Sequence, residues 1–480
     1  MTHRIMERQK GYRAAIEELQ LLGVEVILDR TVLESRYSAD RSAHKPACPV
    51  AAVQPRTVGE VSSIVRVCRK HRLPVTTRGA GTGLEGACIP FAGGLVVDTV
   101  NLQRLDIDAA NSCCWVGAGV DKLKLIKAAH ASGLHFGPDP ASNPSVGGMV
   151  STAGSGMSTL KYGTTRENVL SLVVVTAEGD IVQTRAAVRK SSTGLDLTQL
   201  YCGSEGTLGI VCEICFKLHP HLPYSVGGNA TFPSSAVAVA AVVQLKRAAI
   251  ESLLRCEFLN CGGVEAANAC FGTSLSVVPT VLLELIDSTS EGSRARRDFE
   301  RIKSIFMSHG ALDVVFLQSG KAMDDVWEAR RGCLVAAGMF RNPRKRDKVL
   351  NTDVCVPLTE LASTVGETEK EFDDRGVPCI ICAHVADGNF HCMIPYSSPE
   401  EEKVAKDLEL RLVRRAIAKG GTASGEHGVG IGKVRHLIAE HGRAHIDIQE
   451  RIKGALDPLG LMNPGIFYPS EQEKWQTSHL

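Results

Sequence analysis

The sequence predicts an α+β fold, with a glycine-rich N-terminal half followed by an α/β domain that contains an antiparallel sheet. A chain of 480 residues is too long for one compact core, so two or three domains are expected. Three glycine-rich stretches lie within the first 215 residues, whereas helix-like and strand-like segments alternate from residue 221 to about residue 425. The change of pattern near residue 221 predicts a domain boundary there.

Charge and composition exclude several classes of protein. A net charge of +1 and an isoelectric point near 7.5 argue against nucleic acid or an anionic membrane as the main partner. No apolar run is as long as a membrane span, which predicts a soluble protein. Sixteen cysteines are scattered through a large chain without a secretory signal peptide, which indicates a reducing compartment. The CxxC pairs Cys212/Cys215 and Cys379/Cys382 lie in strand-like sequence, where residues three apart face opposite ways. We therefore expect them to fill apolar space rather than bind zinc.

The first elements are expected ahead of the glycine-rich stretches. Residues 11–23 have the apolar spacing of a leading helix. Thr57 and Glu60 match a capping box, which predicts a helix from there to about Arg72. A short apolar strand then leads into the first glycine-rich stretch.

That stretch, Arg78 to Gly86, reads RGAGTGLEG and contains four glycines. Such turns let backbone N–H groups approach a ligand closely, and a diphosphate is the usual ligand. The GxGxxG match is misleading, because a Rossmann turn opens into a helix and this one leads to a strand at 94–98. A mobile surface loop is the alternative, and two further stretches argue against it.

The second stretch comprises 137–140 and 145–156, where glycines alternate with small hydroxyl residues. A hairpin is predicted at 172–182, turned at Glu178-Gly179-Asp180. The third stretch, 203–210, reads GSEGTLGI. Three such stretches predict one long ligand with a diphosphate, and FAD has a suitable size.

Four motifs occur in order, PVTTRGAGTGLEG, PSVGGMVSTAGSG, YGTTRENV and GSEGTLGIV. Over residues 45 to 220 they resemble the PCMH-type FAD-binding domain of the vanillyl-alcohol oxidase family. Members with covalent FAD carry His at the position of Thr82, so the resemblance implies noncovalent FAD. It also implies these cofactor-binding residues: Arg78, Gly79, Ala80, Gly81, Thr82, Gly83, Gly86, Pro138, Asp139, Ser145, Gly147, Gly148, Thr152, Gly154, Ser155, Gly156, Glu205, Gly206, Gly209, Ile210 and, in a later motif, Asn463.

In the second half, helices are predicted at 237–254, 293–309, 324–334, 359–375 and 401–419, and strands at 281–286, 313–317 and 351–357. The dipeptide Asp387-Gly388 between two β-like runs predicts a hairpin with a two-residue loop. In that register His384 faces His391, with Cβ atoms roughly 5 Å apart.

One histidine in a strand is more often a structural residue, but a facing pair favours a divalent metal site. Glu426, in the glycine-rich segment 420–433, could supply an anionic third ligand, and adjacent His427 would then point elsewhere. The alternative is that this segment is only a flexible connection. A metal-bound alcohol is easier to deprotonate, a neutral histidine can take the proton, and a flavin can accept the hydride. A substrate carboxylate would need a cationic anchor such as Arg330, although the sequence alone does not separate it from Arg331.

The motifs HVADGNFHC, GTASGEHGVGIGK, WEARRG, NTDVCVP and GLMNPGIF resemble the FAD-dependent D-lactate dehydrogenases, a group that also includes glycolate oxidase subunits and D-2-hydroxyglutarate dehydrogenase. The resemblance implies metal ligands His384, His391 and Glu426 for Zn, Mn or Fe, the base His427, and the substrate residues Arg330 and Asn351. It implies four segments: helical 1–44, FAD-binding 45–221, substrate-binding or cap 222–425, and 426–480, whose catalytic loop returns to the FAD domain. Ala386 departs from the glycine that is usual in this hairpin.

Relatives that act on a second carboxylate tend to have a basic residue near Asn351, and its absence favours D-lactate over 2-hydroxyglutarate. Glycolate stays an alternative. Alkyl-dihydroxyacetonephosphate synthase is a weaker one, because that family lacks the histidine pair and has a run of histidines in place of residues 425–428. A redox-inactive FAD-binding scaffold is opposed by the filled catalytic positions. The electron acceptor stays open among cytochrome c, a quinone, electron-transferring flavoprotein and dioxygen.

The chain ends in Ser478-His479-Leu480, which resembles the peroxisomal signal SKL. This predicts a peroxisome or a related microbody such as a glycosome, with a peroxisomal import receptor as partner. A mitochondrial location is the alternative, although acidic residues near the N-terminus weaken a transit-peptide interpretation.

Overall fold

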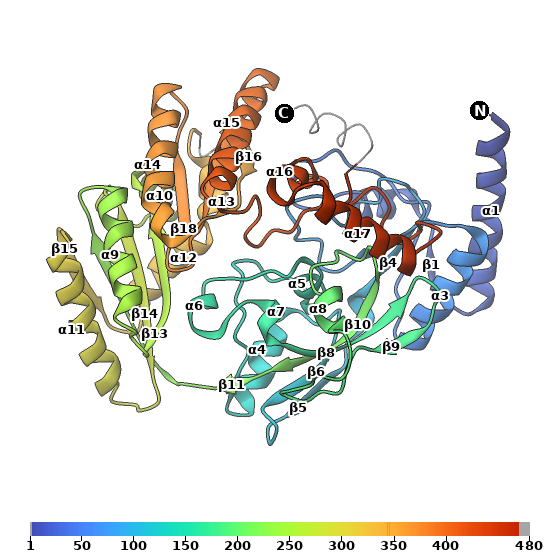
Figure 1. Cartoon of the computed structure of the whole chain (residues 1–480), viewed down its shortest axis with the longest axis horizontal. Helices are drawn as coiled ribbons and strands as arrows, with labels where there is room; N and C mark the ends of the chain where they lie inside the picture. The colour runs from blue at the N-terminus through green and yellow to red at the C-terminus, as the bar shows by residue number, and fades with distance from the viewer. Residues whose placement is uncertain (1, 343, 345, 470–480) are drawn as a thin grey trace. The chain divides into compact units, whose positions relative to one another are not determined.

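The computed structural model describes residues 2–342, 344 and 346–469, and the chain forms two compact units (Figure 1). The first unit contains Met1–Ser155, Thr164–Pro220 and Glu426–Leu480, and the second contains Gly156–Gly163 and His221–Gly425. The short segment 156–163 therefore groups with the second unit, whereas the sequence placed it in the FAD-binding domain. Among the described residues no helix is both long enough and apolar enough to span a bilayer.

The first sheet of the first unit has the order β1 (Val26–Ile27), β2 (Ala51–Val53), β4 (Leu95–Asp98) and β3 (Val75–Arg78). Strands β2 and β3 both run parallel to β4, and helix α3 (Val58–His71) connects them. Thr57 caps α3 by accepting the Glu60 N–H at 3.1 Å, but the Glu60 carboxylate accepts the N–H of Arg56 rather than that of Thr57. The loop after β3 reaches β4 without a helix, as the sequence predicts.

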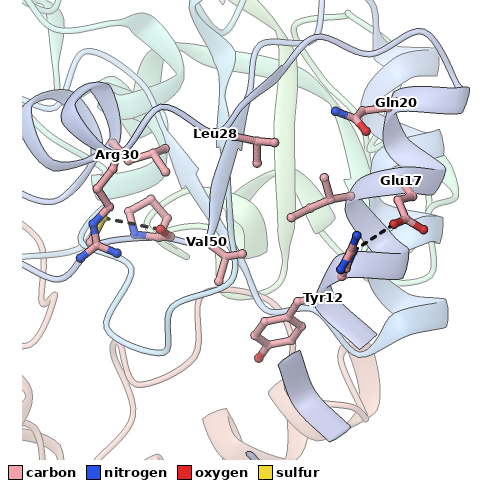
Figure 2. Close-up of a pocket in the computed structure, with 11 residues that line it drawn as sticks. Tyr12, Glu17, Gln20, Leu28, Arg30 and Val50 are labelled. Atoms are coloured by element: carbon pink, nitrogen blue, oxygen red, sulfur yellow. Dashed lines mark hydrogen bonds and ion pairs between the residues drawn. The ribbon is translucent and has the colours of Figure 1, made fainter. Parts of the chain in front are cut away.

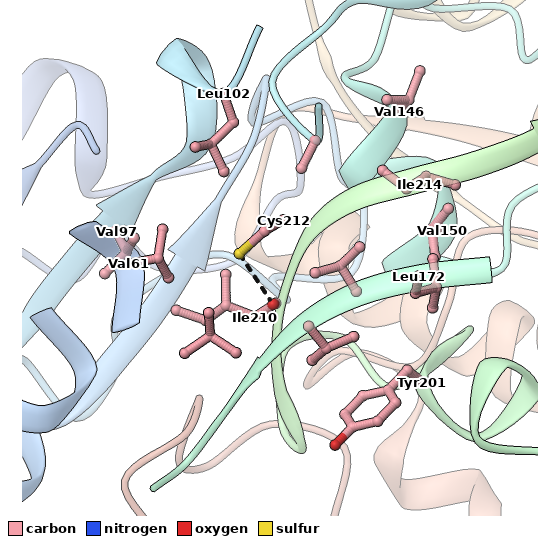
Figure 3. Close-up of a cluster of buried hydrophobic side chains, with 14 of the residues drawn as sticks. Val61, Val97, Leu102, Val146, Val150, Leu172, Tyr201, Ile210, Cys212 and Ile214 are labelled. Atoms are coloured by element: carbon pink, nitrogen blue, oxygen red, sulfur yellow. Dashed lines mark hydrogen bonds between the residues drawn. The ribbon is translucent and has the colours of Figure 1, made fainter. Parts of the chain in front are cut away.

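The second sheet of this unit is antiparallel, with the order β5 (Leu105–Asp108), β6 (Cys113–Gly117), β10 (Gly209–Lys217), β8 (Val169–Thr176) and β9 (Ile181–Gln183). Side chains from both sheets meet in one core. Val61 and Val97 come from the first sheet and its helix, and Leu172 and Ile214 from the second (Figure 3). This shared core fixes the loops at the strand ends relative to one another.

The other elements of the first unit connect these sheets. They are α1 (Thr2–Leu21), α2 (Arg30–Val32), η1 (Leu33–Tyr37), η2 (Thr99–Asn101), α4 (Lys122–Ala131), β7 (Leu134–His135), α5 (Val146–Thr152), α7 (Thr165–Asn168), α8 (Leu197–Tyr201), β11 (His219–Pro220), η3 (Val434–His436), α16 (Leu437–His441) and α17 (Arg443–Leu456). Helix α1 packs on α3, and the last three helices belong to the segment that returns to this unit after Gly425.

The second unit is built on an eight-stranded antiparallel sheet. Its order is β15 (Asp313–Leu317), β12 (Tyr224–Thr231), β14 (Thr280–Asp287), β13 (Leu253–Leu259), β18 (Ile380–His384), β19 (Asn389–Tyr396) and β16 (Lys348–Asn351), and β17 (Val354–Cys355) also pairs with β19. Helices α9 (Ser235–Arg247), α11 (Ser293–Ser308), α14 (Leu358–Asp374) and α15 (Pro399–Ala418) cover one face (Figure 1). Helices α10 (Cys261–Phe271), α12 (Lys321–Arg331) and α13 (Cys333–Met339) cover the other, and α6 (Thr159–Tyr162) packs on β13.

The two faces of this sheet have separate cores because side chains alternate along each strand. Ala383 and Phe390 point to the larger core, and Cys382 and Met393 point to the core beneath α10, α12 and α13. His384 and His391 share the parity of Cys382 and Met393, so both histidines lie on the face covered by α12.

Several sequence-predicted elements differ from the structure. The helix expected at 237–254 ends at Arg247, and Leu253 already begins β13. The helix expected at 324–334 is divided at Gly332 into α12 and α13, and within the strand expected at 351–357 only Asn351, the last residue of β16, and the short β17 are strand. The periodicity of a short apolar run fits a helix or a strand equally well. Tertiary packing and strand pairing therefore decide where each helix ends and each strand begins.

In both cysteine pairs the two members lie in different hydrophobic clusters, as the sequence predicts, and the absence of zinc stays a prediction. All sixteen cysteines are free thiols. Cys212 and Cys215 belong to different hydrophobic clusters, as residues on opposite faces of β10 must. Cys379 and Cys382 are likewise divided between the two cores of the second unit.

Candidate active site

The three glycine-rich stretches meet in the first unit. A Cβ on Gly79 would lie 2.1 Å from Ser145 Oγ, so only glycine permits this approach of the first stretch to the second. The N–H of Ala80 donates to the same Oγ at 3.3 Å. In the third stretch, Glu205 donates its N–H to the carbonyl of Ser151 at 2.9 Å. Loops far apart in sequence thus form one surface.

The second stretch contains a short helix, α5, that the sequence analysis missed. Its N-cap Ser145 accepts the N–H of Gly148 at 3.3 Å, and Thr152 Oγ1 donates to the Gly148 carbonyl. Gly147 packs so closely on Ala118 that an added Cβ would lie 2.6 Å from its methyl group. Tertiary contact therefore stabilises a helix that glycine-rich sequence disfavours by itself.

Some predicted cofactor-binding residues use their side chains to hold these loops. Arg78 Nη1 donates to the carbonyl of Ala39 at 2.8 Å. The carboxylate of Asp139 forms a buried ion pair with Lys122 Nζ at 2.8 Å. The side chains of Arg78 and Asp139 are therefore already paired, and these residues can offer a ligand mainly their backbone N–H groups. Backbone N–H groups are suited to binding phosphate.

The surface also fits an elongated polar ligand. Thr77 Oγ1 and Asn463 Oδ1 are buried and have no hydrogen-bond partner among the described residues. A Cβ added to Gly206 would lie 3.5 Å from Thr77 Oγ1. Buried polar atoms are rarely left unpaired, so partners from a bound FAD would satisfy this site. Of the predicted cofactor-binding residues, only Gly156 lies in segment 156–163, which groups with the second unit.

Glu205 holds the segment that returns after Gly425. Its carboxylate accepts the N–H of Val429 at 2.5 Å and that of Gly430 at 2.8 Å. Ser155 Oγ donates to Glu426 Oε2 at 2.6 Å, and Asn463 Nδ2 donates to the carbonyl of Glu205 at 2.7 Å. The predicted base His427 lies inside this anchored loop.

Burial raises the pKa of Glu205 from 4.5 to about 7, although the two backbone N–H groups oppose the rise. A raised pKa stabilises the folded state when the carboxyl is protonated. This contribution is complete below about pH 4.5 and is lost as the pH rises through 7. We therefore expect wild type to lose stability relative to Glu205→Gln, which cannot ionise, between pH 5 and pH 8. Thermal unfolding of both proteins across this range measures the difference. Glu178→Gln, at an exposed ion pair with Arg69, should show no such trend.

The hairpin of the second unit has a different register from the prediction. His384 pairs with Asn389, and His391 pairs with Cys382, so four residues rather than two form the loop. The reason is a turn in which Asp387 donates its N–H to the carbonyl of His384 at 2.9 Å, while Gly388 has a φ of +84°. The histidines are therefore diagonal neighbours on one face, with ring centroids 5.6 Å apart.

Both imidazoles are oriented through Nδ1. His384 Nδ1 lies 2.9 Å from Glu257 Oε1, and His391 Nδ1 lies 3.0 Å from the carbonyl oxygen of Thr352. When Nδ1 carries the proton and donates it to these oxygens, Nε2 is the atom that each ring can offer to a metal. The donor set therefore fits a divalent cation.

Arg330 is buried, whereas Arg331 is exposed, which separates the two candidates that the sequence left equal. Nη2 of Arg330 lies 2.5 Å from Glu257 Oε2, yet Nε and Nη2 make no well-aligned hydrogen bond among the described residues. Burial disfavours the charge, but Cys382 and Glu257 outweigh it and raise the pKa of Arg330. Nη2 is thus paired with Glu257, whereas Nε has no hydrogen-bond partner among the described residues, and a buried guanidinium of this kind suits a carboxylate ligand.

Asn351 ends β16, and its Oδ1 is buried without a hydrogen-bond partner among the described residues. The prediction that no basic residue lies near Asn351 is wrong in sequence terms. Lys348 lies on the same strand, but it is exposed and, three residues away, points to the opposite face of the sheet.

Gly425, the last residue of the second unit, is anchored beside His391. Its N–H donates to the carbonyl of Asp353 at 3.0 Å, and Ser424 Oγ donates to the carboxylate of Asp353 at 2.9 Å. Asp353 Oδ1 in turn lies 3.6 Å from His391 Nδ1. Glu426 is the next residue in the chain, and consecutive Cα atoms are about 3.8 Å apart.

In the first unit, His427 Nδ1 lies 3.9 Å from Glu85 Oε1, and Lys433 Nζ lies at the same distance from that oxygen. All three side chains are largely buried. A carboxylate therefore lies near the imidazole of the predicted base and near the Lys433 ammonium group.

Sequence reasoning missed Glu257 and Cys382. Glu257 contacts both His384 and Arg330, and the local signal is weak: Glu257 is one of two charged residues, with Arg255, inside the otherwise apolar strand LLRCEFL. Cys382 pairs with His391 across the hairpin. A hydrogen bond from the Cys333 thiol lowers the pKa of Cys382 to about 5 against the opposing effect of burial, and Arg330 lowers it further.

A separate pocket of about 660 Å³ lies beside α1 (Figure 2). Tyr12, Glu17, Leu28, Arg30 and Val50 are among its lining residues, and none of the predicted site residues lines it. It therefore does not coincide with the glycine-rich surface.

The fold and the joined glycine-rich loops define a flavin-binding oxidoreductase. Residues 49–185 match a family model described as FAD binding domain, and residues 223–466 match one described as FAD linked oxidases, C-terminal domain. The chain belongs to the family of FAD-linked oxidases.

Named relatives extend over most of the chain. It is 34% identical over 464 residues to "Probable D-lactate dehydrogenase, mitochondrial" of Danio rerio, which covers 94% of this chain and 92% of the relative. It is 33% identical to "D-lactate dehydrogenase [cytochrome], mitochondrial" of Arabidopsis thaliana, over 92% and 79% of the two chains. It is 32% identical to "Glycolate oxidase subunit GlcD" of Bacillus subtilis, over 95% and 97%.

Solved structures show the same fold at low identity. A 4-ethylphenol oxidase from Gulosibacter chungangensis matches with a TM-score of 0.76 and 17% identity, over 96% of this chain and 98% of that one. An alkyldihydroxyacetonephosphate synthase matches with a TM-score of 0.72 and 18% identity, over 94% and 84%. These matches concern the fold alone. The C-terminal Ser478-His479-Leu480 lies outside the described residues.

Proposed function

We propose that this protein oxidises a D-2-hydroxy acid, with D-lactate as the first candidate, to the corresponding 2-oxo acid. The observation that carries the proposal is the shared sheet face on which His384 and His391 are oriented through Nδ1 next to the buried Arg330. The names of the Danio and Arabidopsis relatives support the choice of D-lactate.

Each residue has a distinct role in this proposal. The guanidinium of Arg330, whose Nη2 lies beside Glu257 and whose Nε has no hydrogen-bond partner among the described residues, binds the substrate carboxylate. Nε2 of His384, Nε2 of His391 and the carboxylate of Glu426 hold a divalent cation. His427 takes the proton of the substrate hydroxyl as general base.

Two groups supply chemistry that these side chains lack. FAD would be held noncovalently by the glycine-rich loops, with Thr82 at the position of covalent attachment in relatives, and would supply a hydride acceptor for the substrate carbon. A divalent cation such as zinc, manganese or iron would be held by His384, His391 and Glu426 and would lower the pKa of a bound hydroxyl.

Anaerobic mixing of the purified flavoprotein with a panel of 2-hydroxy acids tests the function. D-lactate is expected to bleach the oxidised flavin absorbance, L-lactate is not, and prior treatment with a chelator should slow the reaction. Faster bleaching by D-2-hydroxyglutarate or by glycolate would identify that acid, and not D-lactate, as the preferred substrate. Reduction only by L forms, or no effect of metal removal, would contradict the mechanism, and a flavin that no acid reduces would indicate a scaffold.

Glycolate is the second candidate because the Bacillus relative is named a glycolate oxidase subunit. Alkyl-dihydroxyacetonephosphate synthesis is less favoured, because that solved structure shares the fold at only 18% identity. We propose a one-electron acceptor of the cytochrome type from the Arabidopsis name, with a quinone, electron-transferring flavoprotein or dioxygen as alternatives. The word mitochondrial in two relatives' names favours that compartment over a peroxisome.

A further inference from the structure

Glu257 contacts both the proposed metal ligand His384 and the proposed substrate anchor Arg330 in the second unit. It lies on β13, its side chain is 1% exposed, and its two oxygens have different partners. Oε1 lies 2.9 Å from His384 Nδ1, and Oε2 lies 2.5 Å from Arg330 Nη2. One rigidly placed carboxylate thus touches a proposed metal ligand and the proposed substrate anchor.

The chemistry of a buried carboxylate explains what this arrangement does. A buried charge needs paired partners, and Glu257 has one cation and one N–H donor against its two oxygens. Accepting the Nδ1 proton selects the tautomer of His384 that presents Nε2 to a metal. His391 is oriented by a neutral backbone carbonyl, so of the two rings only His384 receives its orientation from the residue that also holds Arg330.

We propose that Glu257 is a positioning residue that couples metal binding to substrate binding. It orients His384 toward the metal and holds the guanidinium of Arg330 in the plane that receives the substrate carboxylate. This inference rests on the proposed function and assigns a role within that site.

Glu257→Gln tests the coupling, because Gln carries no negative charge to pair with Arg330 and has only one acceptor oxygen. The first measurement is the dissociation constant for zinc of the metal-free flavoprotein, by equilibrium dialysis. The second is the separation of KM and kcat for D-lactate. We expect metal affinity to fall by about 10- to 100-fold and KM to rise by about tenfold or more. Values within twofold of wild type for both quantities would overturn the proposal.

Glu284→Gln is the matched control. Glu284 lies on the neighbouring strand β14, is largely buried, and pairs with Arg255 Nη1 at 2.6 Å, so its ion pair involves neither His384 nor Arg330. It should lose stability without change in zinc affinity or KM. Equal losses in both variants would mean that Glu257 is merely structural.

Glu257→Asp provides the second variant and carries the test if the Gln protein does not fold. Asp keeps the charge and both oxygens but is one methylene shorter, so we expect it to lose at least one partner and to weaken zinc affinity or raise KM. Full wild-type values would overturn the proposal. A wild-type protein that binds no zinc and is not reduced by D-lactate would refute the proposed function as well. Tight zinc binding in both wild type and variants would refute only the role of Glu257.

Discussion

Replacement of His391 by alanine is expected to abolish metal binding and to lower the rate of flavin reduction by D-lactate roughly 10³-fold or more. A metal that polarises a substrate oxygen supplies several kcal/mol of transition-state stabilisation, and each 1.36 kcal/mol is about a factor of ten in rate. His391 is buried on β19, next to the sheet edge strands β16 and β17, and its Nδ1 is held by Thr352.

Elemental analysis after dialysis measures the bound metal, and anaerobic stopped-flow absorbance measures the rate. The flavin spectrum should be unchanged, because the glycine-rich loops belong to the first unit. His309→Ala is the control, since His309 is an exposed histidine of the second unit that follows helix α11. A His391→Ala protein with full metal content and a wild-type rate would contradict the proposed ligand set.

The two histidines also show how far local sequence patterns determine a site. The predicted register of the hairpin was wrong, because four residues form the turn in place of two. The slip equals two positions along a strand, and a strand has a period of two, so both side chains still face the same way. The prediction that both histidines lie on one face of the sheet is therefore correct, whereas the prediction that His384 pairs directly with His391 is wrong.

Glu257 could not be found in this way. The apolar run that precedes it suggested a helix to residue 254, although the chain turns at Ala249 with a φ of +48° and enters β13. Its partner His384 lies 127 residues later in the chain. Contacts at that separation depend on which strands become neighbours in the sheet, and periodicity carries no information about the neighbour.

The loops of the first unit were predictable for a different reason. Some of their glycines, such as Gly79, lie so close to a neighbouring segment that no residue with a Cβ would fit. A requirement for glycine is visible in the sequence itself. The hydrogen bonds that the Glu205 carboxylate accepts from Val429 and Gly430 could not be predicted, because they join the third glycine-rich stretch to a segment more than 200 residues later in the chain.

The conservative change Arg330→Lys is expected to lower kcat/KM for D-lactate roughly 10²- to 10³-fold, mainly through KM. Lysine keeps a positive charge for Glu257, so the buried carboxylate stays paired. It lacks the planar fork that binds a carboxylate through two parallel hydrogen bonds. Losing a desolvated charge-assisted contact of this kind costs about 2–5 kcal/mol.

Arg331→Lys is the matched control because the two arginines are adjacent on α12, and the sequence did not distinguish them. Arg331 is exposed, so its replacement should leave KM and kcat unchanged. Steady-state kinetics of both variants with D-lactate, and with glycolate as a smaller monocarboxylate, make the comparison. Because both substrates present the same carboxylate, Arg330→Lys should raise KM for each by a similar factor. A loss confined to Arg331→Lys would move the substrate anchor to the other arginine and remove the reason for placing the carboxylate beside Glu257.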